Sequence, residues 1–171
     1  GLKPQIHVKL GFAVDEIIDF SEESKADLIV IGTTGASGVE EALLGSNASG
    51  VAERSRIPVL CIPDEMKEFK ANDIVYATDL EKNDIEVINK LLVVARLFDS
   101  NFHVLHVHND EMDFTHSEPD ETFKELVEKT GYGSLSFHQI DGENTRETIN
   151  HFIETMPCDI LAMATHHRSF F

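Results

Sequence analysis

Glycine and hydroxyl residues at regular spacing form the clearest candidate binding motif in this sequence. Two glycines bracket a pair of threonines, and a Gly-Ser-Asn triplet begins ten residues after the second glycine. Glycine lets a ligand approach bare backbone, and the N–H groups at the start of a helix attract anions. The spacing therefore predicts a phosphate-binding loop. The residues of this glycine loop are Gly32, Thr33, Gly35, Gly45, Ser46 and Asn47.

Two elements must position this loop. Residues 28–31 are Leu-Ile-Val-Ile without polar alternation, which predicts a central parallel strand with both faces covered by helices. Ser46 is a favourable N-cap residue, and a helix is predicted over 47–55. The alternative is a strand-to-helix turn in which the glycines serve only packing.

Asp79 is a second candidate site residue. Residues 74–79 predict a strand that ends in this carboxylate, and ligands of open α/β sheets bind at the carboxyl edge of the strands. The alternative role for Asp79 is a helix cap or a loop carboxylate. Nine histidines are present without a cysteine or Glu-x-x-His frame, so we predict no metal site. No nucleophile, base and acid stand in a recognisable frame, and we predict no catalytic residue.

The composition restricts the partners that this chain can bind. Lys plus Arg number 14 against 31 Asp plus Glu, a formal net charge of −17, which disfavours nucleic acid and anionic membranes. No run of 18 apolar residues predicts a membrane span. Cys61 and Cys158 lie far apart in the sequence, so we expect neither a disulfide framework nor a zinc site. These features favour a cytoplasmic protein.

Hydrophobic periodicity predicts alternating strands and helices. Strands are expected over 5–10, 27–32, 59–62, 74–79, 102–107, 135–140 and 158–163. Helices are expected over 13–25, 47–55 and 83–98, from Ser117 onward, and from Asn144 or Thr145 to 156. Residues 64–72 are charged and aperiodic, and we interpret them as a linker. The alternation is that of an α/β protein with a doubly wound parallel sheet.

The glycine loop, with ADLIVIG before it and RIPVLCIP after it, resembles the nucleotide-binding signature of the universal stress protein family. The resemblance implies that the loop holds the phosphates and ribose of ATP. It also implies that Asp79 contacts adenine, together with Val107 in a Leu-His-Val segment similar to the second-strand signature. Family members often carry a basic residue inside the loop. Here Glu40 and Glu41 stand in that interval, which makes Mg²⁺ an expected companion of the nucleotide.

The sequence also repeats internally. Residues 26–32 (ADLIVIG) align with residues 158–164 (CDILAMA), a period of 132 that matches one family domain. The resemblance implies a tandem of five-stranded sheets of the adenine nucleotide alpha hydrolase-like kind. Residues 1–63 would supply strands three to five of one unit, and residues 73–171 would form a second unit without its last helix and strand. Each unit is incomplete, which leaves two explanations: the sequence is a fragment of a longer tandem protein, or strands are complemented within one chain or between two.

The second unit differs from the first at its glycine positions. Ala164 stands where the repeat places Gly32, and His167 stands where it places Gly35. Both side chains obstruct backbone approach to phosphate, so the second unit is expected to be degenerate and structural. The predicted function is a stress-response module that binds ATP or another adenine nucleotide and associates as a homodimer or strand-complemented oligomer. The alternatives are a slow ATPase or nucleotide-dependent phosphotransferase, and a dimeric scaffold without nucleotide.

Overall fold

The computed structural model describes residues 3–33, 45–80, 84–108 and 129–165. The chain divides into two compact units, Gly1–Glu68 (unit 1) and Phe69–Phe171 (unit 2). Each unit is described by itself. The division falls inside the stretch 64–72 that the sequence suggests as a linker.

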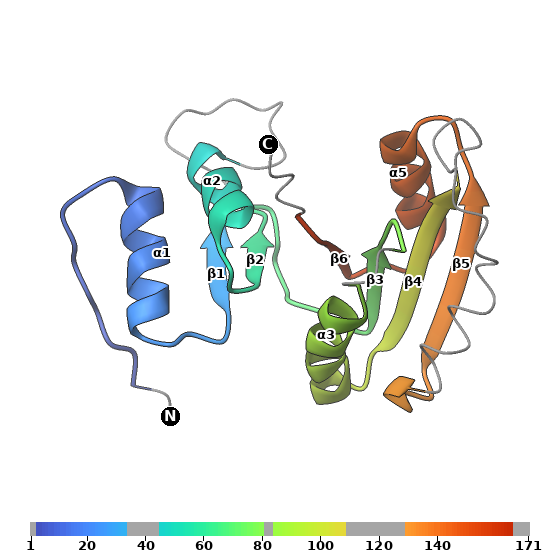
Figure 1. Ribbon diagram of the computed structural model, residues 1–171, viewed down its shortest axis with the longest axis horizontal. Helices are drawn as coiled ribbons and strands as arrows, with labels where there is room; N and C mark the ends of the chain where they lie inside the picture. Colours follow the sequence, from blue (N-terminus) through green and yellow to red (C-terminus); the bar gives the residue numbers. More distant parts are fainter. Residues whose placement is uncertain (1–2, 34–44, 81–83, 109–128, 166–171) are drawn as a thin grey trace, which may run out of the picture. The chain divides into compact units, whose positions relative to one another are not determined.

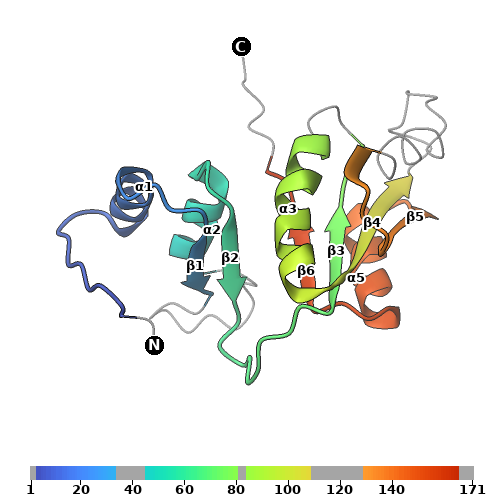
Figure 2. The ribbon, with the colours of Figure 1, turned by 90° about the horizontal axis from the view of Figure 1, so that it is seen from below.

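Unit 1 contains two helices and a two-stranded parallel sheet. In chain order its elements are α1 (Ala13–Glu23), β1 (Ile29–Gly32), α2 (Ser46–Arg54) and β2 (Val59–Ile62). Figure 2 shows that β1 and β2 run in the same direction, in a register that places Ile29 beside Val59 and Gly32 beside Ile62. Helix α1 packs on α2, where Arg54 and Asp15 form an ion pair of 2.6 Å.

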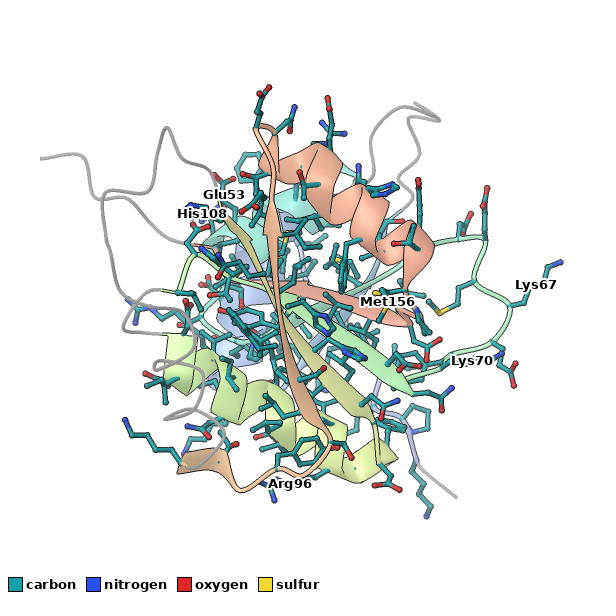
Figure 3. The ribbon with its side chains drawn as sticks, turned by 90° about the vertical axis from the view of Figure 1, so that its right-hand side faces the viewer. Glu53, Lys67, Lys70, Arg96, His108 and Met156 are labelled. Atoms are coloured by element: carbon teal, nitrogen blue, oxygen red, sulfur yellow. The ribbon has the colours of Figure 1, made fainter. Side chains whose placement is uncertain are left out.

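Unit 2 is a four-stranded parallel sheet with helices on both faces. Its sheet order is β5-β4-β3-β6. The elements are β3 (Asp73–Ala77), α3 (Asp84–Phe98), β4 (Asn101–His108), β5 (Leu135–Asp141), α5 (Thr145–Thr155) and β6 (Ile160–Met163). Figure 3 shows α3 and α5 on opposite sides of the strands. This confirms the α/β class and the parallel strands.

Successive side chains of the central strands point to opposite faces of the sheet, and they form one hydrophobic core on each face of unit 2. On one face Ile74 and Tyr76 of β3 pack with Phe102 of β4 against the apolar side of α3. On the other face Val75 and Leu105 pack against Phe152 of α5. Strand β3 is buried on both faces because it lies between two strands and between two helices. The carboxyl ends of β3, β4 and β6 therefore meet at one rigid edge.

The predicted strand over 5–10 is wrong. These residues form no strand, and Ile6, Val8 and Leu10 are 88%, 88% and 96% exposed. The repeat matches residues 3–9 to β5, and among the strands that the structure describes β5 pairs only with β4. The described part of unit 1 has no counterpart of β4. A strand without a partner leaves its backbone groups without ladder hydrogen bonds, and the segment stays irregular.

The expectation that the strand before the glycine loop is covered on both faces is also wrong. In β1 only Ile29 is buried, and Val30 is 60% exposed. Within the described residues β1 pairs with β2 alone, whereas its counterpart β6 pairs with β3. In unit 2 the position beside β3 is occupied by β6 of the same unit.

The other predicted elements within the described residues are confirmed with small shifts at their ends. Helix α1 ends at Glu23 rather than 25, because Lys25 has a φ of 53°, which a helix cannot continue through. The helix expected from Ser117 lies outside the described residues. Among the residues that are described, no helix has the length and apolarity needed to cross a membrane.

Candidate functional site

The ends of the glycine loop of unit 1 are joined by backbone hydrogen bonds. Strand β1 ends at Gly32, and the N–H of Thr33 donates to the carbonyl of Ile62 over 3.0 Å. The N–H of Gly45 donates to the carbonyl of Thr33 over 2.7 Å. Thr33 and Gly45 therefore lie next to each other beyond the carboxyl end of β1. Gly35, Glu40 and Glu41 lie outside the described residues.

Helix α2 begins directly after the loop. Its N-cap is Gly45, with φ −61° and ψ 157°, and not Ser46 as the sequence suggested. Gly45 is extended and its carbonyl accepts the N–H of Ser49, so Ser46 is the first helical residue. Gly45 has no side chain to cap the first turn. The N–H groups of Ser46, Asn47 and Ala48 precede the first intrahelical bond and favour an anion.

Gly32 has no packing role within the described residues. A Cβ added to Gly32 would meet no atom within 4 Å, and its backbone conformation is one that other residues adopt. Gly50 is different, because a Cβ there would lie 3.0 Å from Val14 Cγ2, where α1 approaches α2. Packing alone therefore explains Gly50 and does not explain Gly32. The absence of a side chain at Gly32 leaves bare backbone beside the start of α2.

The carboxyl edge of the unit 2 sheet contains a cavity of about 170 Å³. Its lining residues come from β3, β4, β6 and the start of α5, elements that Figure 1 labels. Both predicted adenine contacts, Asp79 and Val107, line it, and so does Ala164. The other lining residues are Tyr76, Ala77, Thr78, Leu105, Thr145, Ile149 and Met163.

A buried carboxylate supports the turn that carries Asp79. The Tyr76 hydroxyl donates to Asp84 Oδ1 over 2.8 Å, and the Thr78 hydroxyl donates to Asp84 Oδ2. All three residues are at least nine-tenths buried. Burial raises the pKa of Tyr76 well above its usual range, and the bond to Asp84 raises it further. Tyr76 is thus a neutral donor at any physiological pH.

Thr78 also fixes the backbone that follows β3. The N–H of Leu80 donates to Thr78 Oγ1 over 2.9 Å, and Leu80 has a φ of 59°. The Nδ1 of His106 lies 3.0 Å from the carbonyl of Thr78. Thr78 is therefore held on both its side chain and its carbonyl, and Asp79 is left exposed at the mouth of the cavity.

The sequence analysis did not identify this supporting network. Tyr76, Thr78 and Asp84 were assigned only to a strand and a helix. The sequence does contain a signal for this network. A phenol and a hydroxyl stand two residues apart, and so on one face of the strand, and an aspartate begins the next helix. In the described part of the chain, no group of three or more His, Cys, Asp or Glu side chains is placed to hold a metal ion. His167 lies outside that part.

Comparison with known proteins relates the first part of the chain to one family. Residues 1–63 match the model of the universal stress protein family. A universal stress protein of Methanocaldococcus jannaschii is 44% identical over 68 residues, which cover 40% of this chain and 40% of that protein. Universal stress protein G of Escherichia coli O157:H7 is 43% identical over 56 residues, which cover 33% of this chain and 39% of that protein.

Solved structures relate the fold of the whole chain to the same family. A universal stress protein from Archaeoglobus fulgidus matches 88% of this chain with a TM-score of 0.67 and 24% sequence identity. A putative universal stress protein from Pseudomonas aeruginosa matches 95% of this chain with a TM-score of 0.69 and 16% identity. The chain covers 53% and 60% of these two structures. Residues 1–63 thus match the universal stress protein family in sequence, and the chain is similar in fold to solved universal stress proteins.

Proposed function

We propose that this chain is a stress-response module that binds ATP or another adenine nucleotide through the glycine loop of unit 1. The observation that carries the proposal is the bare backbone at Gly32 beside the uncapped first turn of α2. A phosphate there accepts hydrogen bonds from the first-turn N–H groups and interacts favourably with the helix dipole. Ser46 and Asn47 are exposed in that turn and available to the ribose and phosphates.

Charge makes Mg²⁺ a part of this proposal. The chain has a formal net charge of −17, and a free nucleotide is itself a polyanion. A divalent cation on the phosphates reduces the repulsion between the two. We therefore propose that the ligand is the magnesium complex. Affinity for ATP should fall when EDTA removes the metal, and should change less with ionic strength when Mg²⁺ is present.

The test is calorimetric titration with magnesium-ATP and thermal unfolding of the same samples. Gly32→Val fills open space, so we expect a folded variant with at least tenfold weaker nucleotide binding. Gly50→Ala is the matched control, because its Cβ presses on Val14 and lowers the melting temperature while nucleotide affinity is kept. Equal affinity in wild type and Gly32→Val would refute the site. Phosphate release from bound ATP, measured in parallel, separates a binder from a slow ATPase.

For unit 2 we propose a structural part with room for no more than an adenine-sized ligand. The cavity of about 170 Å³ is smaller than the roughly 300–1,000 Å³ typical of ligand pockets. Ala164 lines it where a glycine would leave bare backbone, and Asp79 offers a carboxylate to an amino group. Adenosine should therefore bind weakly and lose binding in Asp79→Ala, but not in Gly32→Val. Loss of adenosine binding in Gly32→Val alone would contradict this assignment.

The exposed apolar row on residues 6–10 favours association as a second function. Ile6, Val8 and Leu10 are almost fully exposed on an irregular segment, and β1 has an edge without a neighbour among the described residues. We propose that a strand from another unit pairs with this segment, as β4 pairs with β5, in a dimer or strand-complemented oligomer. Sedimentation velocity of a variant with Ile6, Val8 and Leu10 changed to Lys should show a smaller species than wild type.

The control for this association test is Val93→Lys. Val93 is 70% exposed on α3, so this substitution changes the charge and the exposed apolar area outside the row. It should leave the sedimentation coefficient unchanged. A monomeric wild type, or an oligomer that survives all three lysines, would refute association through this row.

A further inference from the structure

Two histidines lie side by side on the α5 face of the unit 2 sheet, apart from the cavity. His103 of β4 and His138 of β5 have ring centroids 5.2 Å apart. The Nδ1 of His103 is 3.1 Å from the Nε2 of His138, and 2.7 Å from the hydroxyl of Ser136. The same hydroxyl is 3.2 Å from the His138 Nε2. Two imidazole nitrogens and one hydroxyl therefore share a single triangle of hydrogen bonds.

This triangle accepts one extra proton but not two. A proton on the His103 Nδ1 can be donated to a neutral His138 Nε2 or to Ser136. The Nε2 of His103 is buried, has no hydrogen-bond partner among the described residues, and lies 3.5 Å from Asp73 Oδ1. When the pair carries one extra proton on His103, the charged ring is therefore attracted to the Asp73 carboxylate. When both rings are charged, the two nitrogens that lie 3.1 Å apart both carry a proton. The two cations then repel each other, and neither nitrogen can accept a hydrogen bond from the other.

The remaining neighbours of the pair offer no second anion close by. From α5 the ring of Phe152 packs on His138, with centroids 5.1 Å apart. Cys158 packs against the same apolar cluster, and burial raises the pKa of its thiol, which stays neutral. Asp159 accepts the N–H groups of residues 72 and 73 over 2.7 and 3.2 Å. Among the described residues, Asp73 is the carboxylate that faces His103.

We propose that His103 and His138 form an acid-sensitive latch between β4 and β5, in which a second proton on the pair separates the edge strand β5 from the sheet. Within the described residues strand β5 pairs only with β4, so no other described strand holds it. Its chain continues through Asn144 into α5, whose Thr145 and Ile149 line the cavity. Acid therefore loosens one wall of the cavity together with the strand.

Electrostatics give the direction of the effect. Burial lowers the pKa of His138, and the neighbouring His103 lowers it further. The folded state thus disfavours the proton that the unfolded state accepts at about pH 6.5. The stabilising contribution of the neutral His138 is complete above that pH and is lost as the pH falls below it.

The experiment is amide hydrogen exchange of the full chain at pH 7.5 and pH 5, corrected for intrinsic rates. In wild type, protection of β5 should fall at pH 5 by about tenfold for each pKa unit by which the second protonation is depressed. His138→Gln keeps an acceptor and removes the charge, so its β5 protection should not change with pH. His151→Gln, at an exposed position on α5, should behave as wild type. Identical pH dependence in wild type and His138→Gln would refute the latch.

A second measurement needs no variant. In a proton NMR titration of the wild-type chain, the ring signal of His138 should titrate below the pH at which an unfolded histidine titrates, because burial and the neighbouring His103 lower its pKa. If the His138 ring titrates at or above the pH of an unfolded histidine, the proposal fails.

Discussion

Asp84 stabilises the turn below the candidate adenine position through the two hydroxyl groups that donate to it. Tyr76 and Thr78 are buried and bond to this carboxylate. In Asp84→Ala both hydroxyls stay buried and lose their acceptor. We expect a loss of roughly 3 kcal/mol in the free energy of unfolding, measured with urea. Glu86→Ala, at an exposed position two residues further along α3, should leave the unfolding midpoint unchanged, and an equal effect of both would contradict the role of Asp84.

The Tyr76 hydroxyl gives the fold an alkaline limit. Burial first, and then the bond to Asp84, raise the pKa of Tyr76 above that of an unfolded tyrosine. A raised folded-state pKa means that the contribution is complete below about pH 10 and is lost as the pH rises further. Tyr76→Phe should therefore be less stable than wild type at pH 8 but lose less stability between pH 10 and 11. Parallel pH profiles in guanidinium unfolding would contradict this.

At the scale of elements, α5 depends on its first residues. The Asn144 side chain accepts the N–H of Glu147 over 3.2 Å, and the Glu147 carboxylate accepts from the Asn144 amide over 3.1 Å. This reciprocal cap aligns the first turn, which places Thr145 at the cavity. Asn144→Ala should cost about 1 kcal/mol in chemical denaturation. Asn144→Asp should cost much less, because it keeps the acceptor, and equal losses would rule out the cap.

The elements also explain what could be predicted from sequence. Helices α1, α3 and α5 were predictable because their hydrophobic periodicity is local, and α5 also begins with a local cap at Asn144. The strand over 5–10 failed because a strand needs a partner, and its pattern says nothing of whether one is present. Asp79 and Val107 meet at one cavity because parallel strands end at a common edge. The bond from Tyr76 to Asp84 depends on side-chain geometry between two elements, which residue types alone do not specify.

At the scale of the whole molecule, the two units differ in the size of their cores. In the described part of unit 1 the buried apolar residues are Ile29, Ala48 and Val51. Unit 2 buries a larger set, including Tyr76, Phe102 and Leu105. We expect native-state hydrogen exchange to show lower protection for β1 and β2 than for β3 and β4, since opening follows buried apolar contact. Uniform protection across both units would mean that they unfold as one cooperative body.

The central claim is that a nucleotide binds at the glycine loop of unit 1. The most direct test is amide hydrogen exchange with and without saturating magnesium-ATP, resolved to short peptides. We predict slower exchange at the start of α2, over Ser46 to Ala48, with exchange over β4 unchanged. Slower exchange confined to peptides that contain Asp79 and Val107, or no change anywhere at millimolar nucleotide, would contradict the claim.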